Sequence, residues 1–275
     1  MGLPFDGLRA VVTGSSYGIG AATAERLAAG GAHVVICGRT ATPADRTTYQ
    51  PVSLEETTAR LERYGTTVAS IRADMADETE RSRLIPFAVE ALGGPVDILV
   101  NNAAAGIYKA NSSYPAKHRA LMFEVNFHAP FDLMQQVIPS MRDRGAGWIV
   151  NVSSGVARYA HGSSLAPPPA DRPASPFGTH QGVYGATKAA LNRITVAFAA
   201  ELWGTGIRVN SVEPSGLVLS EGAVARGVEG IPASAIQPMD EMVDSVAYLC
   251  RCPAERTGGV HSSRALLEET GPDRG

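Results

Sequence analysis

Short apolar runs alternate with longer segments of helical spacing along the whole chain. These runs are nearly continuous in apolar residues, as is typical of strands buried on both faces of a parallel sheet. The runs predicted as strands are Arg9–Thr13, His33–Cys37, Thr67–Arg72, Asp97–Asn101, Trp148–Val152 and Ile207–Val212, with a weaker one near Val260. Strands that alternate with helices predict an α/β fold, a doubly wound parallel sheet of about seven strands that binds ligands at its carboxyl edge.

The pattern predicts a single domain over residues 1–275, with two segments that interrupt it. Residues 40–52 are polar and irregular, and residues 155–183 form a long stretch rich in Gly, Pro and Ser. A stretch of that length in a compact domain is either a functional lid or a disordered insertion, and we expect this one to shape a substrate pocket. The polar C-terminal residues 267–275 are predicted to form a flexible tail.

Composition and charge narrow the class of protein. The 275 residues are 44% hydrophobic and 19% charged, which is typical of a globular protein in water. The net charge of −3 gives no reason to expect nucleic acid or an anionic membrane as a partner. No apolar run of 18 residues occurs, the first residues lack a leader pattern, and the three cysteines lack metal-ligand spacing. These features predict a cytoplasmic protein without a metal site.

A glycine-rich turn joins the first predicted strand to the first predicted helix. With the spacing G-x-x-x-G-x-G, it contains Gly14, Ser16, Tyr17, Gly18, Ile19 and Gly20. Glycines at such a turn permit tight backbone geometry and let a pyrophosphate approach the amide N–H groups at the helix N-terminus. The turn therefore predicts a Rossmann-like dinucleotide site at these residues, and an ordinary βα turn is the alternative.

Residues after the second and third predicted strands bear on the choice of dinucleotide. Arg39 stands near the position where an acidic residue would hold the ribose 2′-hydroxyl of NAD, and an arginine accommodates the 2′-phosphate of NADP. The sequence therefore favours NADP(H), with NAD(H) as the alternative and a solvated loop position as the other role for Arg39. Asp74, followed by Met75, is placed to accept a hydrogen bond from the adenine amino group or to belong to a helix N-cap region.

Tyr184 and Lys188 are four residues apart on a predicted helix, which places them on one face. A cation beside a phenol favours the phenolate and lowers the pKa of a tyrosine from its usual value of ~10. Such a tyrosine exchanges protons with a carbonyl or hydroxyl group near neutral pH. The pair indicates redox chemistry at a C–O centre, and an incidental contact on a helix surface is the alternative.

Further polar residues stand at the ends of predicted strands and on one apolar helix. In chain order these are Asn101–Ala104, Asn126, Ser153 and Ser154, and Arg208–Pro214. Together with the glycine-rich turn and the Tyr/Lys pair, this ordered set resembles the short-chain dehydrogenase/reductase family over nearly the whole chain. The resemblance implies hydride transfer between a nicotinamide and the carbon of a small-molecule carbonyl or secondary alcohol.

The resemblance also implies a role for each residue. Tyr184 would be the general acid in reduction and the base in oxidation, and Lys188 would lower its pKa and bind the nicotinamide ribose. Ser154 would hydrogen-bond the substrate oxygen, with Ser153 as the alternative. Asn126 would hold a backbone carbonyl or a water in a proton relay to Lys188. The other implied cofactor contacts are Asn102, Ala103 and Ala104 near the adenosine ribose, and Pro214, Leu217 and Val218 near the nicotinamide carboxamide.

The sequence departs from the family pattern at three places. Ala104 stands where the family usually has glycine, which adds a methyl group beside the adenosine ribose. Ser215 separates Pro214 from the following glycine, which shifts the expected nicotinamide contacts by up to one residue. Ser154 and Tyr184 are 30 positions apart, a wider spacing than the family usually has, so the substrate itself is not predicted.

Two other functions fit parts of the same pattern. A catalytically silent dinucleotide-binding sensor or scaffold would keep the fold but need not keep the Ser/Tyr/Lys set. A sugar-nucleotide epimerase or dehydratase would generally carry a larger C-terminal substrate domain. Apolar faces on the predicted helices Val183–Trp203 and Met239–Cys250 suggest a homo-oligomer, a dimer or a tetramer, although burial within one chain explains them equally well.

Overall fold

The computed structural model describes residues 2–47, 51–158, 180–224 and 231–271. Within these ranges, seven parallel strands form the central sheet in the order β3-β2-β1-β4-β5-β6-β9. The strands are β1 (Arg9–Val12), β2 (His33–Gly38), β3 (Val68–Arg72), β4 (Ile98–Asn101), β5 (Gly147–Val152), β6 (Ile207–Glu213) and β9 (Val260–Ser262). The predicted doubly wound α/β fold is confirmed, and the ends of the six strands predicted with bounds shift by one residue at most.

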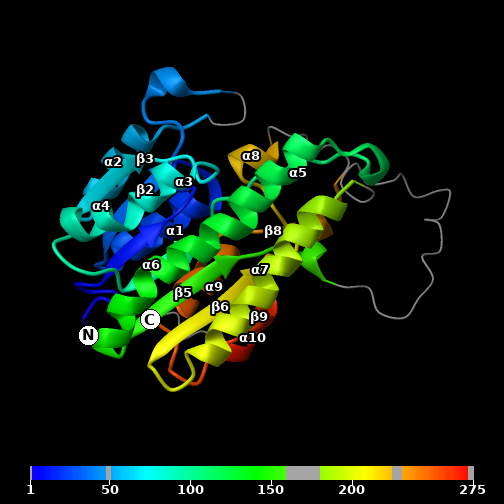
Figure 1. Cartoon of the computed structure of the whole chain (residues 1–275). Coiled ribbons are helices and arrows are strands. Elements are labelled where there is room, and N and C mark those ends of the chain that lie inside the picture. Colours follow the sequence, from blue (N-terminus) through cyan, green and yellow to red (C-terminus); the bar gives the residue numbers. More distant parts are fainter. Residues whose placement is uncertain (1, 48–50, 159–179, 225–230, 272–275) are drawn as a thin grey trace.

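Helices cover both faces of this sheet (Figure 1). One face carries α1 (Gly18–Ala29), α2 (Leu54–Glu62), α9 (Met239–Leu249) and α10 (Ser263–Thr270). The other carries α3 (Glu78–Ser82), α4 (Leu84–Ala91), α5 (Ala116–Phe123), α6 (Ala129–Arg144) and α7 (Gly182–Glu201). Alternate residues of β1 enter opposite cores, Ala10 and Val12 on the first face and Val11 on the second. Burial on both faces explains the nearly continuous apolar runs of the strands.

β1 lies between β2 and β4, where the order of the strands reverses. The helices that follow β1 and β2 pack on one face, and those that follow β3 and β4 pack on the other. In an open α/β sheet, the crevice beyond the carboxyl ends of the strands at such a point is the usual ligand site. The glycine-rich turn after β1 and the Asn-rich end of β4 both lie at this crevice.

A small second sheet lies beyond the carboxyl end of β6. It consists of β7 (Leu217–Val218) and β8 (Ile236–Gln237), which pair in parallel, and α8 (Glu221–Val224) follows β7. Strands of two residues carry no readable hydrophobic period, so the sequence does not predict this sheet.

Two segments predicted from the sequence are described only in part. Of the insertion 155–183, the structure describes a 3₁₀ turn at Gly155–Ala157 and the start of α7, and residues 159–179 lie outside the described ranges. α10 continues to Thr270, so residues 267–270, which the sequence assigned to a flexible tail, are helical. Leu266 anchors that helix in the core, and the hydroxyl of Thr270 donates to its carbonyl at 2.9 Å. No helix in the described ranges is long and apolar enough to cross a membrane.

Candidate active site

The glycine-rich turn at the end of β1 needs its glycines for geometric reasons. Gly14 and Gly18 have φ values of +62° and +64°, a region that side chains disfavour. A Cβ on Gly20 would overlap the side-chain amide of Asn102 and the carbonyl of Gly14. The Nδ2 of Asn102 donates to the carbonyls of Thr13 and Gly14, at 2.9 Å each. The turn and the end of β4 therefore form one rigid unit at the N-terminus of α1.

Thr13 ties the backbone after β4 to this turn. Its Oγ1 accepts hydrogen bonds from the backbone N–H groups of Asn102 and Ala103, both at 3.0 Å. A Cβ on Gly14 would lie 2.7 Å from the Cα of Ala103, so the two segments touch backbone to backbone. Ala104 is exposed, so its methyl group, a departure from the family pattern, displaces no packed side chain.

A carboxylate is bound to the glycine-rich turn. The backbone N–H of Gly18 donates to Oε2 of Glu221, at the start of α8, over 3.0 Å. Ser220 lies beside the same glycine, since a Cβ on Gly18 would be 3.2 Å from its Cβ. An anion therefore fits the N–H groups at the N-terminus of α1, as a phosphate group would.

The predicted adenosine contacts surround the ends of β2 and β3. Ser16 is buried next to Gly38, where a Cβ would lie 3.1 Å from its Oγ, and Arg39 follows as an exposed residue. Oδ1 of Asp74 accepts the backbone N–H of Ala76 at 3.0 Å, so Asp74 closes a local turn. The N-cap of α3 is Asp77, and Met75 is buried beneath this turn.

Tyr184 and Lys188 lie one turn apart on α7, Tyr184 half-buried and Lys188 buried. The Nζ of Lys188 donates to the carbonyl of Val152, the last residue of β5, at 2.7 Å. Burial lowers the pKa of Lys188 from 10.5 to about 8. The ring of Tyr108 meets the ring of Tyr184 edge-on, with centroids 5.7 Å apart. α7 therefore places Tyr184 one turn from a buried cation that is bonded to the end of β5.

Asn126 occupies a π-helical turn, Glu124–His128, between α5 and α6. Its side chain is fully buried and bonds both backbone polar groups of Ala105: Oδ1 accepts the N–H of Ala105 at 2.8 Å, and Nδ2 donates to the carbonyl of Ala105 at 2.9 Å. Nδ2 also donates to Oγ1 of Thr187 at 3.0 Å, and Thr187 donates to the carbonyl of Tyr184 at 2.8 Å. Asn126 thus connects the loop after β4 to the first turns of α7. Such single π turns occur often at functional sites.

The two serines after β5 differ in environment. Ser153 is buried, and its hydroxyl has no hydrogen-bond partner among the described residues. Ser154 is half-buried and leads into the turn Gly155–Ala157, which packs on α7: a Cβ on Gly185 would lie 2.7 Å from the carbonyl of Val156. The structure therefore brings Ser154 and Asn126 to the same part of α7 as Tyr184 and Lys188.

The segment after β6 completes the edge of the site. Pro214 and Leu217 are half-buried, and Val218 is buried against α9 and the core behind it. Glu213, at the end of β6, is buried and forms an ion pair with Arg158, which follows the turn after Ser154.

Within the described ranges, no group of three or more His, Cys, Asp or Glu side chains is arranged to hold a metal ion.

Comparison with family models decides which family this site belongs to. Residues 9–166 match the model described as short chain dehydrogenase, and residues 174–252 match the model described as enoyl-(acyl carrier protein) reductase. The chain belongs to the short-chain dehydrogenase/reductase family. This short-chain dehydrogenase/reductase is therefore an oxidoreductase of carbonyl and alcohol groups with a nicotinamide dinucleotide as its cofactor.

Relatives and solved structures agree with this assignment. A tropinone reductase homologue of Arabidopsis thaliana is 30% identical over 253 residues, 89% of this chain and 84% of that protein. L-xylulose reductase of Mesocricetus auratus is 30% identical over 268 residues, 94% of this chain and 95% of that protein. A 3-oxoacyl (acyl-carrier-protein) reductase of Agrobacterium tumefaciens, solved with NADP bound, is 28% identical with a TM-score of 0.75, covering 95% and 93% of the chains. A short chain dehydrogenase of Burkholderia cenocepacia in complex with NADP gives a TM-score of 0.74 at 28% identity, covering 94% and 97%.

The residues of this short-chain dehydrogenase/reductase fit a dinucleotide. The turn after β1 already binds the carboxylate of Glu221 through the backbone N–H of Gly18, where a phosphate group of the dinucleotide would bind. Sequence reasoning missed Glu221, which has no local motif to mark it. It predicted a backbone carbonyl or a water as the partner of Asn126, and the structure shows the carbonyl of Ala105 in that place, but it did not identify Ala105 or Thr187 by number.

Proposed function

We propose that this enzyme transfers a hydride between NADP(H) and a carbonyl or secondary alcohol, with Tyr184 as the general acid and base. The observation that carries the proposal is the position of Lys188, a buried cation one turn from Tyr184 and bonded to the carbonyl of Val152. A buried ammonium favours the deprotonated form of a neighbouring phenol, which is the property that a proton-exchanging tyrosine needs.

In the proposed reaction each residue of the site has a separate role. The bound cofactor supplies or accepts the hydride. Tyr184 gives a proton to the substrate oxygen in reduction and takes it back in oxidation. Ser154 donates a hydrogen bond to the same oxygen and stabilises its developing charge. Lys188 supplies positive charge behind the phenol, and Asn126 fixes the loop at Ala105 and the first turns of α7.

The preference for NADP(H) over NAD(H) rests on the end of β2. Arg39, at the position predicted for a 2′-phosphate contact, is exposed and directly follows Gly38, which packs against the hydroxyl of Ser16. A guanidinium and a hydroxyl are suited to a phosphate group. The two structural relatives with NADP bound support the same choice.

The names of the relatives support reduction of a ketone as the working direction. They include a tropinone reductase homologue and an L-xylulose reductase, and both names describe reductases. The test is a panel of ketones and secondary alcohols assayed by absorbance with NADPH and with NADH. We expect turnover with at least one ketone and NADPH. Cofactor binding without turnover over the whole panel would instead favour the catalytically silent sensor.

We also propose that the enzyme forms a homo-oligomer through α6 and α7. A groove of about 350 Å³ lies between these two helices, which run side by side in Figure 1. Its lining is largely apolar and includes Phe131, Ile138, Ile194 and Phe198. Analytical ultracentrifugation tests this proposal: a monomer at micromolar concentration would contradict it.

A further inference from the structure

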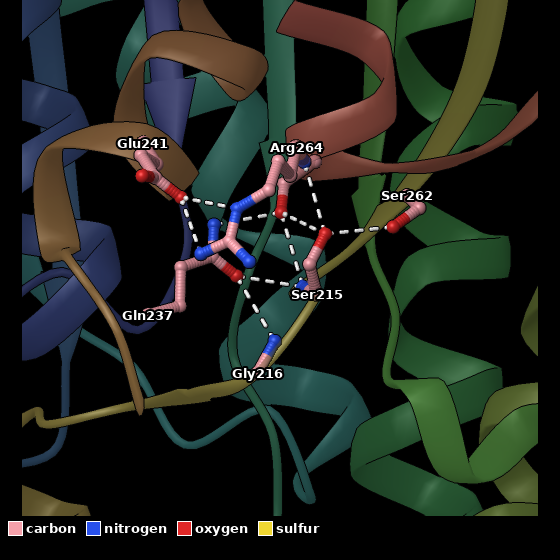
Figure 2. Close-up of polar contacts among 7 residues, drawn as sticks. Ser215, Gly216, Gln237, Glu241, Ser262 and Arg264 are labelled. Carbon is pink, nitrogen blue, oxygen red and sulfur yellow. Dashed lines mark hydrogen bonds and ion pairs between the residues drawn. The ribbon is translucent and has the colours of Figure 1, made fainter. Parts of the chain in front are cut away.

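The side chain of Gln237 is bonded to the segment that follows Pro214 (Figure 2). Gln237 ends β8 and is buried, with 1% of its surface exposed. Its Oε1 accepts hydrogen bonds from two consecutive backbone N–H groups, those of Ser215 at 2.6 Å and Gly216 at 3.2 Å. Its Nε2 donates to the hydroxyl of Ser263 at 2.7 Å. One side chain therefore holds two adjacent peptide groups.

Ser263, the first residue of α10, is the second anchor. It is fully buried, and its Oγ accepts the N–H of Ser215 at 3.1 Å in addition to the bond from Gln237. Oγ of Ser215 in turn accepts the N–H of Arg264 at 3.0 Å and lies 2.7 Å from the hydroxyl of Ser262. The loop after β6 is thereby tied to the N-terminus of α10.

The chemistry of the donors sets the orientation of Gln237. A backbone N–H can only donate, so the amide oxygen must face Ser215 and Gly216 and the NH₂ group must face Ser263. An apolar residue in place of Gln237 would leave the N–H of Gly216 without this acceptor. The loop can satisfy such an unpaired N–H only by moving toward water, which shifts its position.

The ion pair between Arg264 and Glu241 lies outside this network and contributes less. Two bonds of 3.1 and 3.3 Å join the side chains, seen above Gln237 in Figure 2. Their exposed fractions are 47% and 31%, and ion pairs this exposed contribute little to stability because water and salt screen them. Gln237 and Ser263 are therefore the residues that hold the loop.

The loop they hold carries the proposed nicotinamide contacts. Leu217 and Val218 follow Gly216 directly, and Val218 is in register with Gln237 in the small sheet. A Cβ on Gly216 would lie 2.7 Å from the carbonyl of Ala235, so the loop also touches the residues before β8. Ser215, the extra residue relative to the family pattern, supplies three of the bonds to this network.

We propose that Gln237 and Ser263 are positioning residues that set where the loop 214–218 meets the nicotinamide end of the cofactor. The proposal rests on the proposed function, because it takes this loop as the carboxamide contact. The adenosine half is predicted to bind at the ends of β1 to β3, whereas the loop follows β6, three strands from β1 in the order of the central sheet.

The experiment compares two ligands by titration calorimetry. NADPH carries the nicotinamide half, and adenosine 2′,5′-bisphosphate lacks it. Gln237→Met should weaken NADPH binding about tenfold and change binding of the bisphosphate less than about twofold. Asn210→Leu is the matched control, because Asn210 is equally buried and also bonds two backbone groups, the N–H of Gly259 and the carbonyl of Arg256. That control should lower the thermal midpoint and keep the affinity for NADPH.

Ser263→Ala is the milder second variant, should Gln237→Met fail to fold, and it should weaken NADPH binding in the same selective way. Unchanged NADPH affinity in the variants, or equal losses for both ligands, would overturn the inference while the proposed function stands. If the unaltered protein binds no NADPH, the proposed function is overturned and this inference with it.

Discussion

The backbone N–H of Gly18 donates a hydrogen bond to the carboxylate of Glu221 over 3.0 Å, at the turn where a cofactor pyrophosphate is expected. A bound pyrophosphate would compete with that carboxylate for the same donor and would be repelled by its charge. We therefore expect Glu221→Gln to tighten NADPH binding about fivefold, equivalent to about 1 kcal/mol at a helix N-terminus.

Titration calorimetry measures this change, and Glu90→Gln is its control. Glu90 is an exposed residue on α4, so the control makes the same change in net charge away from the turn. Weaker NADPH binding by Glu221→Gln would show that the carboxylate assists the cofactor, in contradiction to the prediction.

Lys188 makes stability depend on pH. Burial lowers its pKa from 10.5 to about 8, so the unfolded chain binds the proton more tightly between these values. The free energy of unfolding therefore rises with pH between about 8 and 10.5, by about 1.4 kcal/mol per pH unit. Below pH 8 the destabilising cost of burying the ammonium is fully present. Lys188→Met should abolish turnover, raise stability at pH 7 and remove this rise.

Urea unfolding of the cofactor-free protein at several pH values between 7 and about 10 measures the effect of Lys188. The exposed Lys109→Met variant is the control and should follow the unaltered protein. A Lys188→Met variant that is less stable at pH 7 would mean that other groups fully offset the buried charge.

Asn126 joins the backbone N–H and carbonyl of Ala105 to the side chain of Thr187 on α7. Asn126→Leu keeps the size of the side chain but leaves these buried polar groups unsatisfied, at a cost of about 3 kcal/mol in unfolding free energy. We expect kcat to fall at least about tenfold, because a small displacement of catalytic groups slows reaction. Asn192→Leu, on α7, is the control: it loses one hydrogen bond, from the hydroxyl of Ser211, and should keep its kcat. Full kcat in Asn126→Leu would argue against a positioning role.

Arg39 should distinguish the two cofactors. Arg39→Ala removes a guanidinium from the position predicted for the 2′-phosphate, so KM for NADPH should rise about tenfold or more while KM for NADH changes little. Arg83→Ala, an exposed arginine at the start of α4, is the control. Equal effects on the two cofactors, or a tenfold preference of the unaltered enzyme for NADH, would contradict the prediction.

Much of the fold could be predicted from the sequence because the pattern of apolar residues that marks a strand or helix lies within a few neighbouring positions. Strands such as His33–Gly38 are buried on both faces and therefore apolar at nearly every position. The positions of Tyr184 and Lys188 on one helix face follow from their spacing alone. The strands of the small sheet, Leu217–Val218 and Ile236–Gln237, are too short for such a signal.

The contacts that position the site could not be predicted, because they join residues far apart in the chain. Gln237 meets Ser263 across 26 residues, and Glu221 meets Gly18 across 203. Nothing local distinguishes a glutamine with two backbone partners from one in water. The π turn around Asn126 was also missed, since its residues have ordinary helical spacing.

The most direct test of the proposed mechanism is the turnover of Tyr184→Phe with NADPH and the best ketone of the panel. The variant keeps the ring that packs against Tyr108 and loses only the hydroxyl. We predict that kcat falls at least about a hundredfold, as expected for loss of a general acid, while NADPH affinity stays nearly unchanged. Tyr248→Phe, on α9 beside Arg256, is the control and should stay fully active. Full activity in Tyr184→Phe would contradict the assignment of Tyr184 as the proton donor.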